Sequence, residues 1–314
     1  MALYITFPSW IKPEIFSFLP IRWYGLMYIL AFGCAYYFIT LQAKHDEITL
    51  SKDQSLDIVM WCVIGLILGA RLFSVLFYDG TTYYLTHPHL IFWPFRNGQF
   101  VGLPGMSYHG GLFGAAVSAI IYTRKRKIPF FEVADTVVYS VPLGYTFGRL
   151  GNFINGELYG RVSTKPWAMI FPDAPAYSTN YEWVRQIADQ LHIPYEVGQY
   201  INLPRHPSQL YEALFEGIFL FFFLWFVIKP KRKEKPFGTG LSWYLIGYGT
   251  VRFFIEYLRS PDANLGYILS WGAGSDNIAL FYSFLNISMG QIFCLIMIAF
   301  GGALRLIIHI RSNR

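Results

Sequence analysis

The feature that most constrains this chain is a series of long apolar stretches separated by short polar links. A helix that crosses a bilayer needs about 20 mostly apolar residues. Seven stretches meet that requirement: residues 22–41, 58–78, 104–122, 134–154, 209–228, 239–258 and 288–308. Charged residues make up only 14% of the chain, against about 25% in soluble domains. The pattern therefore predicts an all-α polytopic membrane protein with about seven transmembrane helices.

Positively charged residues gather in three places, two of them between predicted spans and the third at the C-terminal end of the chain. Four occupy residues 124–127, five lie within residues 229–235, and three, Arg305, Arg311 and Arg314, lie at the end of the last span or follow it. Lys and Arg are in excess in cytoplasmic loops. All three groups share that side if the N-terminus is outside and the number of spans is odd. We therefore expect an external N-terminus and a cytoplasmic C-terminus.

The longest link between predicted spans, residues 155–208, then lies on the outer side. It is too long for a tight turn, so we expect a small extracytoplasmic cap inserted between spans four and five. Residues 259–287 form a second external loop. The rest of residues 1–314 makes a single membrane-embedded domain, without the internal repeat of many secondary transporters. The N-terminal residues lack the pattern of a cleavable signal peptide, so we expect the first span to be retained.

The overall charge and the cysteines argue against other classes of function. The formal net charge is +6, but the basic residues lie in short runs between apolar stretches, which argues against nucleic-acid binding. Cys34, Cys62 and Cys294 lie far apart, and their spacing matches neither a metal site nor a disulfide framework. We expect no metal and no soluble cofactor, and any thiol chemistry should come from a substrate.

The densest group of polar residues near membrane depth is the glycine-rich segment 148–160, at the exit of the fourth predicted span. Its glycines allow close backbone approach to a ligand, and Arg149 offers a planar fork that suits a phosphate. Asn152, Asn155 and Glu157 add donors and a carboxylate. A glycine-rich helix end with a snorkelling arginine is the structural alternative. Charges at this depth usually face a cavity or a partner, which favours a binding site.

A second cluster, formed by Tyr248, Arg252, Glu256 and Arg259, ends the sixth predicted span. The spacings of four and three residues place the last three side chains on one helical face. One interpretation is a buried Arg252–Glu256 pair that neutralises itself. The other is an arginine held in position for a phosphate, and the two are compatible.

Residues 107–111 open the third predicted span and contain His109. Histidine titrates near neutral pH, so His109 is the natural candidate for a general base, although a lone histidine on an apolar face is more often structural. The two glycines that follow it leave room for a ligand. Tyr24, at the start of the first span, is an alternative hydrogen-bonding partner or an ordinary interfacial aromatic residue.

Residues 205–212 lead into the fifth predicted span. Ser208 is a candidate N-cap, with Tyr211 and Glu212 in the first turn of the helix. Capping of the helix is one explanation for this segment, and a contribution to a polar site is the other.

Taken together, these segments resemble the prolipoprotein diacylglyceryl transferase family. Residues 148–160 are similar to the family's signature almost position for position, and the resemblance continues in family order along nearly the whole chain. It is carried by residues 22–28, 108–111, 148–160, 206–212, 247–249 and 288–291, with Arg252, Glu256, Arg259, Pro261 and Asp262. Residues 263–286 depart from the pattern, because this loop is longer than the family usually has.

The resemblance implies a bacterial transferase of the cytoplasmic (inner) membrane that acts in lipoprotein biosynthesis. Its donor would be phosphatidylglycerol in the bilayer, and its acceptor the thiol of the lipobox cysteine of a preprolipoprotein. The transfer would form a thioether and release glycerol phosphate, the first step of lipoprotein maturation, without a metal or cofactor. Negative charge then grows on the departing phosphate, where fixed cations such as Arg149 and Arg252 would stabilise it.

The residues expected to act by this resemblance fall into three groups. The catalytic group is His109, Arg149, Arg252, Tyr24 and Glu256. Contacts to phosphatidylglycerol are expected from Arg149, Asn152, Asn155, Glu157, Gly160 and Arg252, and support from Arg205, His206, Tyr211, Tyr248 and Arg259. His109 is the hypothesis for the base that takes the thiol proton. Glu157 or Glu256 could instead orient the arginines or accept that proton.

The main alternative from another class is a transporter or flippase for an anionic lipid or a phosphate compound. Buried arginines and broken helices would serve such a protein equally well. The missing repeat and the ordered family-like segments weigh against it. Release of glycerol phosphate on addition of an acceptor peptide would separate the two functions.

Overall fold

The computed structural model describes residues 3–16, 19–45, 48–77, 81–96, 98–100, 102, 105–260, 266–272, 274 and 277–312. The chain divides into two compact units: a first unit, Met1–Cys34 with Val138–Arg314, and a second unit, Ala35–Val137. Helix α1 (Trp23–Lys44) begins in the first unit and ends in the second. Pro261 and Asp262 of the family-like pattern lie outside the described residues. So do Arg314, residues 78 and 104 at the ends of two predicted spans, and part of the loop 263–286.

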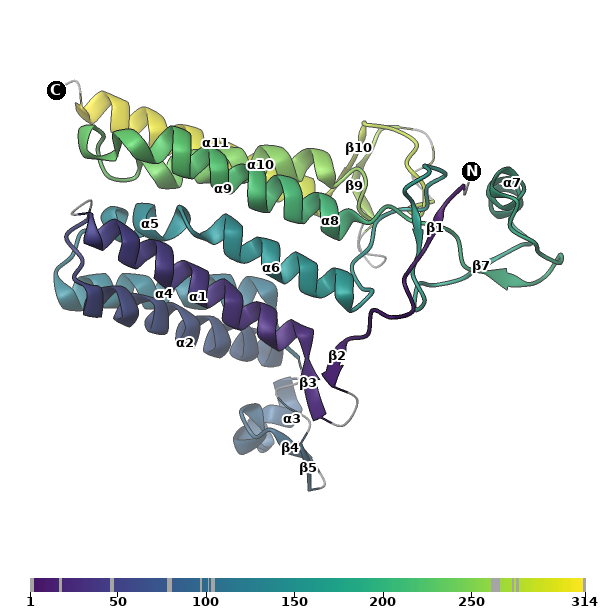
Figure 1. Cartoon of the computed structure of the whole chain (residues 1–314), viewed down its shortest axis with the longest axis horizontal. Coiled ribbons are helices and arrows are strands. Elements are labelled where there is room, and N and C mark those ends of the chain that lie inside the picture. Colours follow the sequence, from purple (N-terminus) through teal and green to yellow (C-terminus); the bar gives the residue numbers. More distant parts are fainter. Residues whose placement is uncertain are drawn as a thin grey trace. The chain divides into compact units, whose positions relative to one another are not determined.

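Helices make up most of the first unit (Figure 1). Helix α6 (Val141–Ile154) contains the start of the glycine-rich segment, and α7 (Glu182–Leu191) belongs to the link 155–208. A long helical stretch follows, made of α8 (Ser208–Glu212), a π-helix (Ala213–Phe219), α9 (Leu220–Phe222), a second π-helix (Phe223–Ile228) and a 3₁₀ helix (Lys229–Glu234). The last two helices are α10 (Thr239–Ile255) and α11 (Met289–Ser312).

Small residues bring α10 and α11 together along their length (Figure 1). A Cβ atom on Gly249 would lie 3.0 Å from the carbonyl oxygen of Cys294, and one on Gly301 would lie 3.0 Å from that of Ser242. Close backbone contact of this kind drives helix association in lipid, where the hydrophobic effect between helices is absent. The pairing fixes Arg252 of α10 relative to the first turn of α11.

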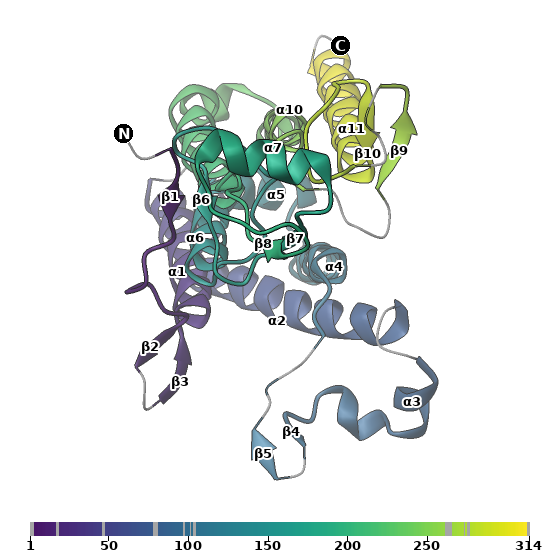
Figure 2. The same cartoon turned by 90° about the vertical axis from the view of Figure 1, so that its right-hand side faces the viewer.

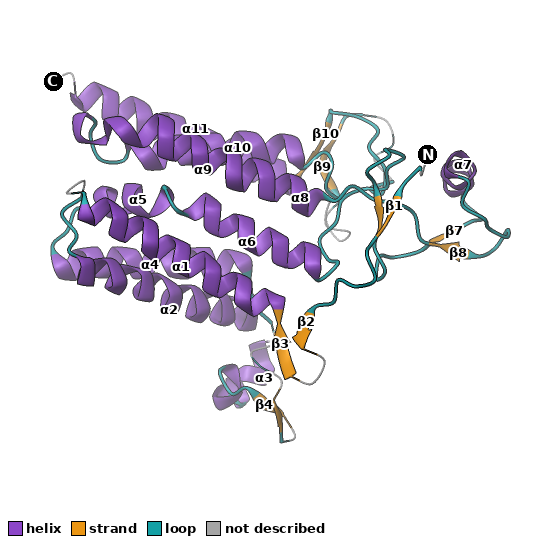
Figure 3. Ribbon diagram, in the orientation of Figure 1, coloured by secondary structure: helices purple, strands orange, loops and turns teal. Residues whose placement is uncertain are grey.

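The strands are short and form two-stranded sheets (Figure 3). In the first unit, β1 (Ile5–Thr6) pairs in parallel with β6 (Met169–Ile170) (Figure 2). The other strand pairs of this unit are antiparallel: β2 (Glu14–Phe16) with β3 (Leu19–Arg22), β7 (Tyr177–Ser178) with β8 (Tyr200–Ile201), and β9 (Tyr267–Ser270) with β10 (Asn286–Ser288). In the second unit, β4 (Phe95–Arg96) pairs with β5 (Gln99–Phe100). Two-stranded pairs are marginal on their own, so packing and side-chain hydrogen bonds must hold these segments.

One buried arginine ties residues 155–208 to the last loop of the first unit. Arg161 is 2% exposed. Its Nε atom donates to the carbonyl of Tyr257 at 3.0 Å, and its Nη1 atom donates to the Tyr267 hydroxyl at 2.6 Å. Nη1 also donates to the carbonyls of Ile278 and Leu280, at 2.8 and 3.0 Å. The guanidinium therefore serves as the connecting point of three chain segments.

The second unit contains α2 (Lys52–Phe77), α3 (Thr81–Thr86), a 3₁₀ helix (Pro88–Ile91), α4 (Tyr108–Arg126) and most of α5 (Phe130–Val138). Glycines let α2 and α4 touch backbone to backbone. A Cβ on Gly69 would lie 2.3 Å from the carbonyl oxygen of Gly110, and one on Gly114 would lie 2.1 Å from that of Gly65. These positions therefore require glycine.

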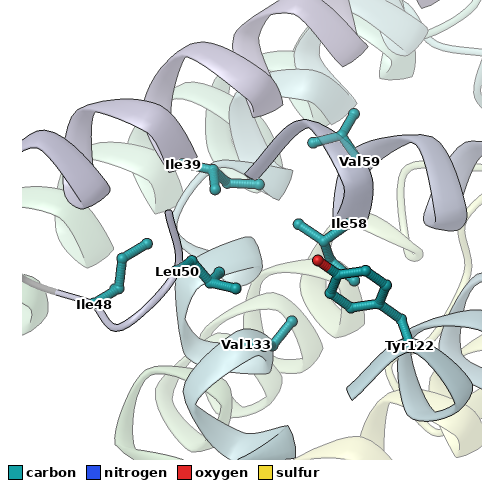
Figure 4. Packing of buried hydrophobic residues seen from close by; sticks show 7 residues of the cluster. All are labelled: Ile39, Ile48, Leu50, Ile58, Val59, Tyr122 and Val133. Atoms are coloured by element: carbon teal, nitrogen blue, oxygen red, sulfur yellow. The ribbon is translucent and has the colours of Figure 1, made fainter. Parts of the chain in front are cut away.

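The core of the second unit lies at one end of these helices (Figure 4). Its buried side chains come from α1, α2, α4, α5 and the link between the first two helices: Ile39, Ile48, Leu50, Ile58, Val59, Tyr122 and Val133. The ring of Tyr122 is 1% exposed, and its hydroxyl donates to the carbonyl of Gln54 at 3.2 Å. A buried tyrosine needs such an acceptor.

Within the described residues, four helical stretches are long and apolar enough to cross a membrane: Trp23–Lys44, Lys52–Phe77, Ser208–Ile228 and Met289–Ser312. They coincide with four of the seven predicted spans. The chain is thus a mostly helical membrane protein, and the number seven stays a prediction. The fourth predicted span, 134–154, is divided between α5 and α6, because Pro142 near the start of α6 lacks the backbone N–H that a continuous helix would use.

Candidate active site

Two arginines of the first unit share one buried carboxylate. The Nε atom of Arg149, on α6, lies 2.8 Å from Oε2 of Glu212. The Nη1 atom of Arg252, on α10, lies 3.0 Å from the same oxygen. Glu212 ends α8 and its side chain is fully buried. The glycine-rich segment, with Arg149, and the second cluster, with Arg252, are therefore joined by Glu212, which belongs to the segment 205–212.

Further carboxylates surround Arg252. Its Nη2 atom lies 2.7 Å from Oε2 of Glu256, and its Nη1 atom lies 3.4 Å from Oε1 of Glu216. The hydroxyl of Ser288 donates to Oε1 of Glu256 at 3.2 Å. The predicted Arg252–Glu256 pair is confirmed, and it is one part of a larger network. We call Arg149, Arg252, Glu212, Glu216 and Glu256 the arginine–carboxylate cluster.

A tyrosine completes this cluster. The hydroxyl of Tyr145 donates to Oε2 of Glu216 at 2.6 Å and approaches Oε2 of Glu212 at 3.2 Å. The guanidinium of Arg149 lies over the ring of Tyr145, 4.6 Å from its centroid, a favourable cation–π distance. Tyr248 meets the same ring edge to face, at 5.8 Å between centroids. These contacts hold the plane of the Arg149 guanidinium in one orientation.

The cluster has three carboxylates and two guanidiniums, and the guanidinium of Arg259 adds a further positive charge that acts on Glu212. All five side chains of the cluster are buried or nearly so. Buried ions are stable only when their partners are in place, so loss of one member exposes the others to a large desolvation cost. These ion pairs orient the arginines before any anionic ligand arrives.

A chain of side-chain amides extends the cluster from Arg149. Nη1 of Arg149 donates to Oδ1 of Asn152 at 3.4 Å, and Nδ2 of Asn152 donates to Oε1 of Glu157 at 2.9 Å. Nδ2 of Asn155 reaches the same carboxylate oxygen at 3.4 Å. Gln209, on α8, donates from Nε2 to the backbone carbonyl of Glu157 at 2.6 Å. We call Asn152, Asn155, Glu157 and Gln209 the amide chain.

One nitrogen of Arg149 is left for a ligand. Nε is engaged by Glu212 and Nη1 by Asn152, whereas Nη2 makes no hydrogen bond with the described residues. The side chain is 14% exposed. An oriented guanidinium with an unengaged N–H edge can bind a phosphate oxygen. This arrangement can stabilise an anion, and its fixed dipoles need no rearrangement to do so.

Tyr24 lies against the glycine-rich segment. A Cβ atom on Gly151 would come within 2.9 Å of the Tyr24 ring. The ring of Tyr28, one turn along α1, meets Tyr24 edge to face at 5.1 Å. The predicted catalytic tyrosine therefore packs on α6 in the first unit, beside the helix that carries Arg149.

Three predicted residues lie where residues 155–208 join the end of α10. Gly160 forms a backbone bridge with Arg259, and a Cβ on Gly160 would lie 2.3 Å from the carbonyl oxygen of Leu258. The expectation that Arg259 shares a helical face with Arg252 is wrong, because α10 ends at Ile255. Arg205 is buried and its guanidinium lies between two tyrosine rings.

His206 and Tyr211 form a short polar relay beside this junction. The indole N–H of Trp167 donates to the Tyr211 hydroxyl at 2.7 Å, and that hydroxyl lies 3.2 Å from Nδ1 of His206. Burial, with the nearby charges of Lys165 and Arg161, lowers the pKa of His206 to about 4. The imidazole is therefore neutral at physiological pH. Ser208 is not the N-cap that we expected, because Pro207 holds that position and the Ser208 hydroxyl donates to the Leu158 carbonyl.

His109 belongs to the second unit, where it lies exposed in the first turn of α4. Ser107 caps this helix by accepting from the Gly110 amide at 3.3 Å. The interpretation of Gly110 as room for a ligand is wrong, because a Cβ there would lie 2.5 Å from the Gly69 carbonyl oxygen and the glycine serves the contact of α4 with α2. A Cβ on Gly111 would make an ordinary contact with Leu66 at 3.4 Å, so room for a ligand beside Gly111 stays a prediction.

The predicted site residues do not include Tyr145, Glu216, Ser288 or Gln209, although Ser288 and Gln209 lie in family-like segments. Glu212 is named only within residues 205–212, for which helix capping and a contribution to a polar site are the two explanations. A signal for the two carboxylates was present. Glu212 and Glu216 stand four residues apart in an otherwise uncharged span, and ionisable residues within a span are functional by default. No comparable signal marks Tyr145, since the chain contains 23 tyrosines.

A metal centre is not among the features of this site. In the described ranges, no group of three or more His, Cys, Asp or Glu side chains is arranged to hold a metal ion. The cysteines Cys34 and Cys62 are half-buried and Cys294 is buried, all three as free thiols.

Comparisons of the amino-acid sequence with known proteins identify the family of this chain. The model of the prolipoprotein diacylglyceryl transferase family matches residues 13–307. A phosphatidylglycerol–prolipoprotein diacylglyceryl transferase of Treponema denticola is 49% identical over 100% of this chain and 97% of its own length. Proteins of the same name from Treponema pallidum (44% identical, 95% of this chain, 93% of its own) and Chlorobaculum tepidum (43%, 94% and 89%) are also similar. The chain belongs to the prolipoprotein diacylglyceryl transferase family.

Proposed function

We infer that this chain is a phosphatidylglycerol–prolipoprotein diacylglyceryl transferase of the bacterial inner membrane. Its substrates are phosphatidylglycerol and a prolipoprotein, as in the relatives that carry this name. The acceptor atom is the thiol sulfur of the lipobox cysteine. The observation that carries the assignment is the pair Arg149 and Arg252, buried in a family-like segment and oriented by a shared carboxylate.

The reaction makes one bond and breaks one. The acceptor sulfur forms a bond to the terminal glyceryl carbon of the lipid, and the bond from that carbon to the phosphate oxygen breaks. Glycerol phosphate leaves with the bonding electrons, and the thiol proton is taken by a base. Because negative charge builds on the phosphate, cations that contact it stabilise the transition state more than the ground state.

Arg149 is the residue that contacts the phosphate in this proposal. Its Nη2 edge is unengaged by the described residues, while Glu212 and Asn152 hold the rest of the guanidinium. Arg252 is more completely engaged, by Glu212, Glu216 and Glu256. We assign Arg252 the second positive charge and the positioning of Glu212. Asn152, Asn155, Glu157 and Gly160 line the donor site with these arginines.

The proton acceptor is assigned to His109. An unperturbed cysteine thiol has a pKa of about 8.5, so a base raises the fraction of the reactive thiolate. His109 is exposed on its unit and therefore accessible to a substrate. Tyr24, packed on Gly151, is the hydrogen-bonding alternative, and Glu256 orients Arg252. Arg205, His206, Tyr211, Tyr248 and Arg259 support the site by packing.

The membrane arrangement in this proposal has seven spans, an external N-terminus and a cytoplasmic C-terminus. The whole chain is one membrane-embedded domain, and residues 155–208 form an extracytoplasmic cap. The basic residues at 124–127 and 229–235 then lie on the cytoplasmic side. The donor reaches the site laterally from the bilayer, since both diacylglyceryl chains remain in lipid.

The proposal is tested by reconstitution of the purified chain with phosphatidylglycerol and a synthetic lipobox peptide. Mass spectrometry should find a diacylglyceryl group on the cysteine, with release of an equal amount of glycerol phosphate. Neither product should form with a Cys→Ser peptide, and Arg149→Ala should abolish both. A folded protein that moves lipid between leaflets without these products would support the transporter alternative instead.

A further inference from the structure

Three buried oxygen atoms along the cluster and the amide chain accept no hydrogen bond. They are Oδ1 of Asn155, Oε1 of Gln209 and Oε1 of Glu212, and no donor in the described part of the chain reaches them. Gln209 and Glu212 are both fully buried. A buried acceptor without a donor costs free energy, so three near one site call for a common explanation.

The orientation of the two amides is fixed by Glu157. Asn155 donates from Nδ2 to the Glu157 carboxylate, and Gln209 donates from Nε2 to the Glu157 carbonyl at 2.6 Å. Both partners are acceptors only, so turning either amide over would place oxygen against oxygen. The carbonyl ends of Asn155 and Gln209 are therefore the ends presented to a ligand.

The unpartnered oxygens belong to one continuous network. Gln209 and Glu212 are three residues apart on α8, which places them on the same face of that helix. Oε2 of Glu212 is bound by Arg149, and Arg149 is linked to Asn155 through Asn152 and Glu157. The three acceptors are thus linked through hydrogen bonds and an ion pair to the guanidinium that the proposed function assigns to the phosphate.

A phosphate cannot satisfy these acceptors, because its oxygens also accept hydrogen bonds. The ligand must bring O–H or N–H donors on the same side as the phosphate. The head group of phosphatidylglycerol does so, since its glycerol carries two hydroxyls beyond the phosphate oxygen. Resting on the proposed function, we propose that Gln209 and Asn155, with Glu212, form a subsite in which these two hydroxyls each donate to one of the three oxygens, and that this subsite selects the head group of the lipid donor.

The hydroxyls are remote from the bond that breaks. The reaction cleaves the bond between the diacylglyceryl carbon and the phosphate, on the other side of phosphorus from the head-group glycerol. Removal of the hydroxyls therefore alters the leaving group little. A change in rate with head-group structure reports recognition rather than intrinsic reactivity.

The test compares lipid donors that differ only in these hydroxyls. Phosphatidylglycerol, phosphatidyl-1,3-propanediol, phosphatidyl-1,2-propanediol and phosphatidylpropanol are supplied with a lipobox peptide to the full-length enzyme, and kcat/KM is measured for each. Wild type should prefer phosphatidylglycerol to phosphatidylpropanol by about tenfold or more, because each lost hydroxyl leaves a buried acceptor unpaired. Equal rates on all four donors would overturn the proposal without any variant.

The variant Gln209→Met then tests whether Gln209 recognises the hydroxyls of the head group. The variant should lose about tenfold on phosphatidylglycerol and change little on phosphatidylpropanol, so that the preference collapses. An equal loss on both donors would show that Gln209 acts only by holding Glu157, and would refute the subsite. Asn155→Leu removes the other unpartnered amide oxygen of the amide chain. It provides a second variant, for which we expect the same pattern of rates.

Asn202 provides a matched control. Its Nδ2 atom donates to the carbonyl of Phe171 at 2.6 Å and its Oδ1 atom has no donor among the described residues, as in Gln209, but no described hydrogen bond joins it to the cluster. Asn202→Leu should keep the full preference for phosphatidylglycerol, and a collapse there would refute the assignment. If wild type forms no thioether with any donor, the proposed function itself fails, an outcome distinct from equal transfer.

Discussion

The first unit buries arginines in two different ways. Arg161 and Arg205, outside the predicted spans, direct their guanidiniums to backbone carbonyls and aromatic rings. Arg149 and Arg252, in the arginine–carboxylate cluster, direct theirs to carboxylates. Arg149, Arg252 and Glu212 are far apart along the chain and meet only in the folded structure. Both pairs are almost removed from solvent, so burial alone does not distinguish a structural arginine from a functional one.

The partners make the distinction. Carbonyls and rings are neutral and surround Arg161 on several sides, so the residue acts as a connector between chain segments. The carboxylate of Glu212 is charged and binds Arg149 at Nε, and Nη2 of Arg149 makes no hydrogen bond with the described residues. Buried carboxylates orient the guanidinium, and one of its N–H groups remains available for a hydrogen bond. This arrangement favours the binding of an anion.

The largest effect that follows from this comparison is expected at Arg149. Arg149→Lys should lower transfer from phosphatidylglycerol by about 100-fold or more, because one ammonium cannot hold Glu212 and Asn152 and still present a further N–H to the phosphate. Single-turnover rates with a lipobox peptide measure this. Arg185→Lys, on α7, is the matched control, since the hydrogen bonds of Arg185 within the described residues go to backbone carbonyls. Near-normal transfer by Arg149→Lys would contradict phosphate recognition.

The connector arginine should behave differently. Arg161→Met should destabilise the folded protein by about 3 kcal/mol, because buried acceptors around the Nη1 atom lose a charged donor. Thermal unfolding in detergent and limited proteolysis between residues 266 and 285 measure this loss. The rate per folded molecule should stay within a few-fold of wild type. A large fall in that rate, with unchanged stability, would mean that the two kinds of arginine are not distinct.

A smaller effect is expected from pH through His206. Its pKa in the folded protein is about 4, below the usual 6.5, because the ring is buried near Lys165 and Arg161. The unfolded chain therefore binds the proton more readily between these two values, and stability falls as the pH drops from 6.5 to 4. The loss should be about 2 kcal/mol, reduced from the full linkage value by partial solvent exposure. It should be absent in His206→Asn, and a parallel pH profile for that variant would exclude His206 as the cause.

Much of this fold follows from the sequence. Apolar length predicts the helices at Trp23–Lys44, Lys52–Phe77, Ser208–Ile228 and Met289–Ser312, since hydropathy is a local property. The spacing of four between Arg252 and Glu256 also predicts their pairing, because both lie at the end of one helix. Local patterns thus account for the elements and for contacts within them.

The composition of the site depends on packing between elements, which no local pattern specifies. Glu212 and Arg149 are 63 residues apart, and only the contact of α6 with α8 and the π-helix that follows brings them together. Gly110, directly after His109, shows that a local pattern can also be misinterpreted. A ligand and a neighbouring helix both require a missing side chain, and sequence alone does not distinguish them, whereas the 2.5 Å approach of a Gly110 Cβ to the Gly69 carbonyl does.

The smallest predicted change in stability contrasts two glycines of the family-like segment. Gly160 lies at the junction with α10, where a Cβ would come within 2.3 Å of the Leu258 carbonyl oxygen, so Gly160→Ala should destabilise by about 1 kcal/mol or more. Gly148 lies within α6 and a Cβ there meets nothing within 4 Å. Because alanine favours a helix, Gly148→Ala should raise stability slightly, by up to about 1 kcal/mol.

The rate of diacylglyceryl transfer by Gly148→Ala then adds a second measurement to the stability of this variant. If the open space beside Gly148 receives the lipid donor, the added methyl group should raise the KM for phosphatidylglycerol about three- to tenfold while stability is kept. Packing against the described residues does not require glycine at this position, so a rise in KM would report a contact with the ligand. Unchanged KM in a variant of wild-type stability would remove Gly148 from the donor site and confine that site to the edge of Arg149 and the amide chain.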